Sequence, residues 1–145
     1  MFARKLNCIK NIIVAGAVVN GVIVYKSYQK FSKLKDSLDK FVWFSQETLM
    51  PSKDDFDYDL VGTAFSSVSL DLTDALDGDD AHFDIISDYS NILIKVKSGT
   101  QVKLNGDSKY SRAKVLQEAD SKLFTQTLEI NYALAYSNLV VEVIS

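Results

Sequence analysis

The stretch Tyr89-Ser90-Asn91-Ile92-Leu93-Ile94-Lys95-Val96 decides the fold, because its pattern returns elsewhere in the chain. An aromatic residue, a serine and a small polar residue precede a strand in which apolar residues alternate. Two further clear copies begin at Phe65 and Tyr136, and a fainter copy begins at Tyr110. The steps from aromatic to aromatic are 24, 21 and 26 residues, which is typical of stacked repeat architectures. The sequence therefore predicts several copies of one structural unit.

Within each copy, alternate residues of the strand point to the same face of a sheet. A second strand precedes the bend at 82–87 and at 128–134, and a shorter one at 102–104. Turn signals close the units at 76–79, 97–100 and 105–107. Each unit is thus predicted to run strand, bend, strand, turn. The predicted core face consists of Val68, Leu70, Leu72, Ile92, Ile94, Val96, Leu139, Val141 and Val143.

Units of this length cannot bury an apolar face alone, so they must stack on one another. We predict a mainly β fold with an N-terminal helix, in which residues 51–145 form a repetitive β domain. That domain is a short β-solenoid or β-helix-like stack of repeated two-strand units, and a folded-over sandwich is the alternative. The sequence does not separate the two.

Residues 1–26 are predicted to form an N-terminal membrane anchor. The run from Asn11 to Tyr25 is uncharged and lies between Lys10 and Lys26. With Leu6 as its first residue and Lys10 snorkelling, it spans about 30 Å of hydrocarbon as a helix. A cleaved signal peptide is the alternative, because Ala15-Gly16-Ala17 looks like a cleavage site. The apolar run continues past that site, which favours an uncleaved anchor.

Residues 27–50 are predicted to form an amphipathic helix followed by an aromatic connector. Apolar residues recur at helical spacing from Ser27 to Lys40, namely Tyr28, Phe31, Leu34, Leu38 and Phe41. This stripe lies either on lipid headgroups or on the following domain. The aromatic peak 41–44 follows, and Pro51 marks the boundary of the β domain.

Charge is distributed unevenly along the chain, although its formal net value is only −3. The first forty residues are basic and the remainder is acidic, which suits an anionic lipid surface near the N-terminus. The predicted β domain has no basic patch interleaved with aromatic residues, so we predict no binding to nucleic acid. We expect a single-pass protein of the cell membrane. Lysines on both sides of the span leave its orientation nearly balanced, with a slight preference for a cytoplasmic domain.

No constellation of residues in the sequence indicates catalysis. His82 is the only histidine, and it lies between Asp80 and Asp84 on a predicted strand. Aspartates are frequent between residues 71 and 84, but their spacing does not match a calcium-binding EF-hand loop. The single cysteine, Cys8, excludes an intramolecular disulfide. We therefore predict no catalytic, cofactor-binding or metal-binding residues, no cofactor, and no enzymatic activity.

The repeat resembles the C-terminal domain of LiaF-type proteins of the bacterial cell-envelope stress response. The resemblance covers Phe56 to Ser145 and rests on an aromatic, two small residues and an alternating strand. Ser-Ser and Ser-Asn stand here where the family commonly has glycines. The resemblance implies a right-handed, β-helix-like domain beside a membrane that acts through contacts with a signalling partner. It implies no functional residue, because the shared positions are structural.

Taken together, these observations predict a non-enzymatic, membrane-anchored interaction, scaffold or sensor module in cell-envelope stress signalling. Its expected partners are the lipid bilayer and either another protein or a second copy of the chain. The alternative is a module that binds a lipid, a glycan or calcium, suggested by Trp43, Phe44 and the aspartate run. A hydrolase that uses His82 is a third, weaker hypothesis.

Overall fold

The computed structural model describes residues 22–76, 78–117 and 124–144. The chain divides into two compact units, Met1–Asp36 and Ser37–Ser145. Most of the predicted anchor at 1–26 lies outside the described residues. In the part that is described, no helix is both long enough and apolar enough to cross a membrane.

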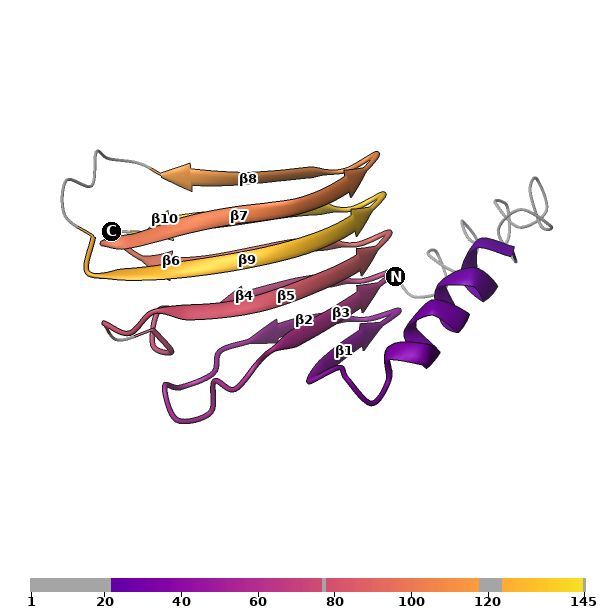
Figure 1. Cartoon of the computed structure of the whole chain (residues 1–145), viewed down its shortest axis with the longest axis horizontal. Coiled ribbons are helices and arrows are strands. Elements are labelled where there is room, and N and C mark those ends of the chain that lie inside the picture. The colour runs from indigo at the N-terminus through magenta and orange to yellow at the C-terminus, as the bar shows by residue number, and fades with distance from the viewer. Residues whose placement is uncertain (1–21, 77, 118–123, 145) are drawn as a thin grey trace. The chain divides into compact units, whose positions relative to one another are not determined.

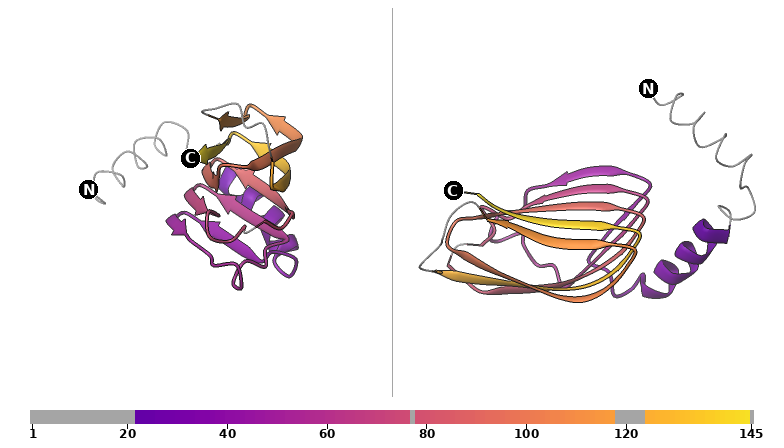
Figure 2. Two further views of the ribbon diagram at one scale, coloured as in Figure 1. Left: turned by 90° about the vertical axis from the view of Figure 1, so that its left-hand side faces the viewer. Right: turned by 90° about the horizontal axis from the view of Figure 1, so that it is seen from above.

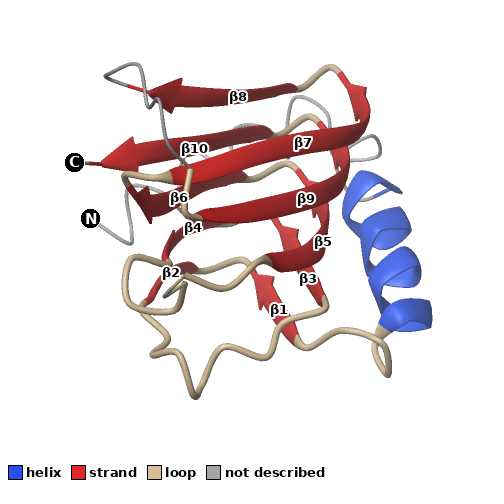
Figure 3. Ribbon diagram, turned by 60° about the vertical axis from the view of Figure 1, so that its left-hand side comes forward, coloured by secondary structure: helices blue, strands red, loops and turns tan. Residues whose placement is uncertain are grey.

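The described residues of the second unit form ten strands in two parallel sheets, and Figures 1 and 3 show both sheets. Odd-numbered strands form one sheet in the order β1-β3-β5-β9-β7, and even-numbered strands form the other in the order β2-β4-β6-β10-β8. The two sheets face each other when the unit is seen from above (Figure 2, right). The mainly β class is therefore confirmed. The strands are β1 Lys40–Trp43, β2 Gln46–Leu49, β3 Leu60–Ala64, β4 Ser67–Asp71, β5 Ala81–Asp88, β6 Asn91–Lys97, β7 Thr100–Lys109, β8 Arg112–Gln117, β9 Gln126–Ala135 and β10 Asn138–Ile144.

The predicted amphipathic helix ends earlier than the sequence indicated. Helix covers residues 22–34 in the described part and gives way to turns at 35–37. Phe31 is buried and Leu34 is half-buried, whereas Tyr28 is exposed. Phe41, the last member of the predicted stripe, lies in β1. The helix does not extend to Phe41 because Phe41-Val42-Trp43 consists of aromatic and β-branched residues, which pack well in a β-sheet.

The predicted aromatic connector is instead the first two-strand unit of the stack. Phe44 and Ser45 form the bend between β1 and β2, so a fifth copy of the repeat lies within 27–50. The predicted boundary at Pro51 is therefore too late. The copy escaped detection because each of its strands has only four residues. Its alternation is also disguised, because Lys40 and Glu47 occupy core-facing positions and pair at 3.3 Å.

The units do not stack in the order in which they follow along the chain. The last unit, β9–β10, lies between β5–β6 and β7–β8 (Figure 1). β10 is an apolar strand paired on both sides, by β6 and β8. The faint copy, β7–β8, is polar and mostly exposed, and it ends the stack. This order is favourable because it gives the apolar unit two neighbours and leaves the polar unit at the edge.

All nine residues of the predicted core face are buried. They pack against residues from the other sheet, of which Phe83, Ile85, Leu128 and Ile130 are fully buried. The predicted turn at 105–107 is wrong, because these residues continue β7. Gly106 pairs there with Tyr132, and an added Cβ would lie 2.8 Å from the backbone nitrogen and carbonyl carbon of Tyr132. Position 106 thus requires glycine because two strands approach closely there, not because the chain turns.

Each bend places an aromatic residue in the left-handed backbone region, with φ between 48° and 52°. This conformation costs an L-residue about 1–2 kcal/mol. The five rings stack in one column, in the order Phe44, Phe65, Tyr89, Tyr136 and Tyr110. The rings of Tyr89 and Tyr136 are separated by 4.7 Å between centroids and tilted by only 4°. Stacking thus offsets the backbone strain at the bend.

The serine after each aromatic forms a second column, built from hydrogen bonds. The backbone N–H groups of Ser45, Ser66, Ser90 and Ser137 donate to the hydroxyls of Ser66, Ser90, Ser137 and Ser111, at 2.9–3.2 Å. Each of these accepting hydroxyls donates to the carbonyl two residues before it. The bends are therefore locked in register with one another, with their polar groups satisfied inside the structure.

Substitutions of Tyr89 separate the stabilisation from ring stacking from the cost of the strained backbone at the bend. Tyr89→Ala removes the ring but keeps a Cβ at positive φ, and we expect it to lower the free energy of unfolding by about 3 kcal/mol. Tyr89→Gly removes the ring and also relieves the backbone strain, so we expect it to be less destabilising by about 1 kcal/mol. Urea unfolding of both variants measures the difference. An alanine variant more stable than the glycine variant would contradict a strained bend.

Candidate functional site

His82 lies on the outer face of β5 and is about half exposed. Its Nε2 is 3.1 Å from Asp84 Oδ1, and its Nδ1 is 4.0 Å from Glu129 Oε1. His82 and Glu129 occupy one register row, and Lys103 continues that row on β7. Polar and charged side chains directly opposite one another stabilise neighbouring strands by cross-strand pairing. The side chains of His82 and Asp84 are both about half exposed, so this group of residues is open to water.

The aspartates of the acidic run do not converge on one point. Asp71 accepts hydrogen bonds from Thr73, Asp79 pairs with Lys53 at 3.3 Å, and Asp80 accepts from the backbone N–H of Thr127 at 2.8 Å. Asp77 lies outside the described residues. Over the described residues, no group of three or more histidine, cysteine, aspartate or glutamate side chains could hold a metal ion. Asp71, Asp79 and Asp80 thus hold turns and neighbouring segments in place.

Asp71 shows this structural role most clearly. Its Oδ1 accepts from the hydroxyl of Thr73 at 2.6 Å and from the backbone N–H of Thr73 at 3.0 Å. These two hydrogen bonds, the side-chain bond foremost, lower the pKa of Asp71 below its ordinary value of 3.8, and the charge of Lys95 adds to the effect. The ionised carboxylate therefore anchors the turn that follows β4.

Asp71→Asn should lower the free energy of unfolding at neutral pH by about 1 kcal/mol, as the loss of a capping carboxylate does. Because the folded-state pKa is depressed, this stabilisation is present above the unfolded pKa and is lost as pH falls through the folded value. The gap in stability between the wild type and the variant should therefore begin to shrink near pH 3.8 and close once the pH has fallen below the lower folded-state pKa. Denaturant titrations at a series of pH values test this, with exposed Asp74→Asn as control. A gap that persists at the lowest pH would contradict it.

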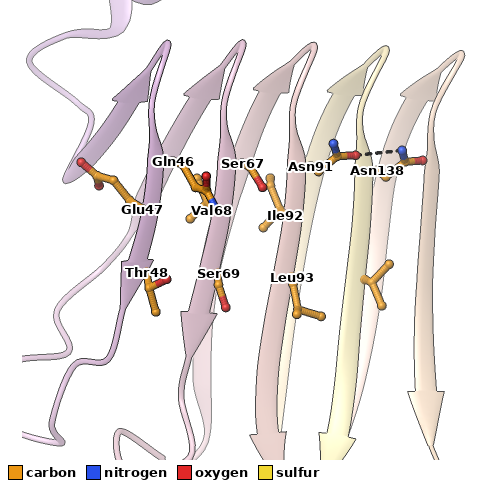
Figure 4. A pocket seen from close by; sticks show the side chains of 11 residues that line it. Gln46, Glu47, Thr48, Ser67, Val68, Ser69, Asn91, Ile92, Leu93 and Asn138 are labelled. Carbon is orange, nitrogen blue, oxygen red and sulfur yellow. Dashed lines mark hydrogen bonds between the residues drawn. The ribbon is translucent and has the colours of Figure 1, made fainter. Parts of the chain in front are cut away.

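A shallow groove of about 290 Å³ crosses the outer face of the even-numbered sheet. It runs across β2, β4, β6 and β10, and Figure 4 shows its side chains in rows along neighbouring strands. The first row consists of Gln46, Ser67, Asn91 and Asn138, which the strand register aligns. The lining is completed by the outward-facing Thr48, Ser69, Leu93 and Val140, and by Glu47, Val68 and Ile92, which lie between the two rows on the same strands and face the core.

The groove combines hydrogen-bonding side chains with a small apolar patch. Asn138 Nδ2 donates to Asn91 Oδ1 at 3.0 Å, so these two amides are held in a fixed orientation (Figure 4). In the second row, Thr48 and Ser69 give way to Leu93 and Val140, which are half-buried. Convergent polar groups beside apolar surface are typical of a site that binds a ligand without reacting with it.

Sequence reasoning missed this groove because it assigned the residue after the bend serine to the bend alone. The structure places that residue at the start of a strand, facing outward. Its recurrence as Ser67, Asn91 and Asn138 was the available signal. Trp43 and Phe44, which suggested a ligand surface, instead extend the aromatic column, with Trp43 edge-on to Phe44 at 4.9 Å.

Comparison with known proteins identifies no relative of this chain. No protein-family profile, no curated protein and no solved structure matches it. The resemblance of the repeat to LiaF-type proteins therefore stays a prediction.

Proposed function

We propose that this protein is a non-enzymatic interaction module, in which residues 1–26 anchor the chain in a cell membrane in a single pass. Residues 37–145 form a short β-solenoid that presents a protein-binding face. The groove on the outer side of the even-numbered sheet carries this proposal. A parallel sheet with ordered side-chain rows holds its outward-facing groups in place, and such pre-organisation lowers the entropic cost of binding.

The chemistry of the groove suits an extended segment of a partner protein. The amides of Asn91 and Asn138 and the hydroxyls of Ser67 and Thr48 offer both donors and acceptors to a peptide backbone. Leu93 and Val140 provide apolar contact for a side chain. The register rows continue on β8 as Arg112 and Lys114, which favours an acidic group in the partner. By its resemblance to LiaF-type proteins, the module acts in cell-envelope stress signalling as a scaffold or sensor.

Site-specific photo-crosslinking in intact cells tests the groove. A benzophenone amino acid at Ser69 should give one discrete adduct with a second protein, because this side chain lines the groove. The same label at Asn131, on the outer face of the other sheet, serves as the control. Leu93→Lys should reduce the Ser69 adduct by about tenfold, because it places a charge in the apolar patch. Identical adducts from both labelled positions would argue against a binding face at the groove.

A linear glycan is a second candidate ligand, favoured by the fixed amide pair at Asn91 and Asn138. Hydroxyl groups of a sugar chain that crosses the strands would meet one polar side chain per strand, every 4.7–4.9 Å or so. Calorimetric titration with chitopentaose tests this alternative. Asn138→Ala should weaken such binding by about tenfold, through the loss of hydrogen bonds. The absence of heat at millimolar glycan would leave the protein partner as the sole proposal.

A further inference from the structure

The two ends of the strand stack differ in how their open edges are protected. At the end formed by β1 and β2, the edge strands have four residues each, and the Lys40–Glu47 ion pair occupies core-facing positions. Short edge strands and inward-pointing charges are standard obstacles to pairing with another chain. At the opposite end, β7 has ten residues, and among the described residues it pairs with β9 alone.

The free edge of β7 presents a regular set of backbone groups. The carbonyls of Gly99 and Lys109 accept hydrogen bonds from the β9 side, at Thr125 and Tyr136. Backbone groups alternate between the two sides of a strand, and the pairing of β7 with β9 is continuous from Thr100 to Lys109. Even-numbered residues therefore direct their N–H and C=O groups to the free edge. They are Val102, Leu104, Gly106 and Ser108.

We propose that this edge binds β7 of a second copy of the chain, antiparallel and about a two-fold axis at Asn105. In this register Lys103 lies opposite Asp107 of the second copy, and the symmetry makes the pair twice. Both side chains are on the exposed outer face. They form a non-hydrogen-bonded pair, the class in which opposite side chains come closest. This surface is separate from the groove and does not depend on the proposed function.

The charges select this register over its neighbours. Centring the pair on Lys103 would set two lysines face to face, and centring it on Asp107 would set two aspartates face to face. Moving the two-fold axis to Gly106 would place Lys103 opposite Lys109. Like charges directly opposite destabilise a strand pair, and opposite charges stabilise it. A lysine on an edge strand usually discourages pairing with another chain. Here Lys103 lies opposite Asp107 of the second copy, so the two side chains attract each other.

Apolar side chains at the same end of the stack give the association a driving force. Val102 and Leu104 face the core from β7 and are only partly buried, because no further unit covers them among the described residues. On β8, Val115 is 36% exposed and Leu116 is 46% exposed. A second copy would cover Val102 and Leu104 as the next unit does elsewhere in the stack. Leu104 would lie opposite Gly106 of the second copy.

Charge exchange on the full chain, purified in a mild detergent, tests the proposal. Light scattering coupled to size exclusion should find a dimer for the wild type. Lys103→Asp and Asp107→Lys should each weaken the dimer by about tenfold or more, because each creates two like-charge pairs. The double variant restores both attractions and should recover the dimer. A monomeric wild type, or a dimer unaffected by either single exchange, would overturn the proposal.

A symmetric disulfide tests the position of the axis. Asn105→Cys in a Cys8→Ser background should form a covalent dimer on mild oxidation, because the residue lies opposite its own copy. Gln101→Cys is the matched control on the same face of the same strand, and it should remain monomeric because it lies opposite Lys109. Crosslinking of Gln101→Cys in preference to Asn105→Cys would refute this register.

Discussion

The bend after each odd-numbered strand is the constraint on which the remaining structure depends. An aromatic residue there adopts a left-handed backbone that its own side chain disfavours, and it is held by stacking on the rings of the units above and below. The following serine connects the same units through hydrogen bonds. Because both columns run through all five bends, no unit can slip without breaking contacts with its neighbours.

This register has consequences on both faces of each strand. On the inner face it brings apolar residues of successive units into contact, which forms a continuous core. On the outer face it brings equivalent residues into rows, which is how polar residues some twenty or more positions apart come to line one groove. The groove is thus a direct product of the repeat, and it needs no loop to hold it.

The two ends of the stack differ in how well their edge strands are suited to pairing with another chain. The first unit places an ion pair where the other units have apolar residues, so its edge is unsuited to further pairing. The other end carries the longest strand pair of the odd sheet, β7 with β9, and leaves apolar side chains partly uncovered. In the proposed pairing only this end associates, so two copies would form a closed pair instead of an open fibre.

The sequence by itself determined the repeating unit, the bends and the nine buried positions, because alternation and a recurring aromatic-serine step are local signals. Only the tertiary structure decided that Phe44 belongs to the column, that Gly106 lies within a strand, and that β9–β10 is inserted before β7–β8. Each of these depends on which unit lies beside which. Neighbouring units are chosen by long-range burial of apolar surface, and a local pattern of alternation carries no information about that choice.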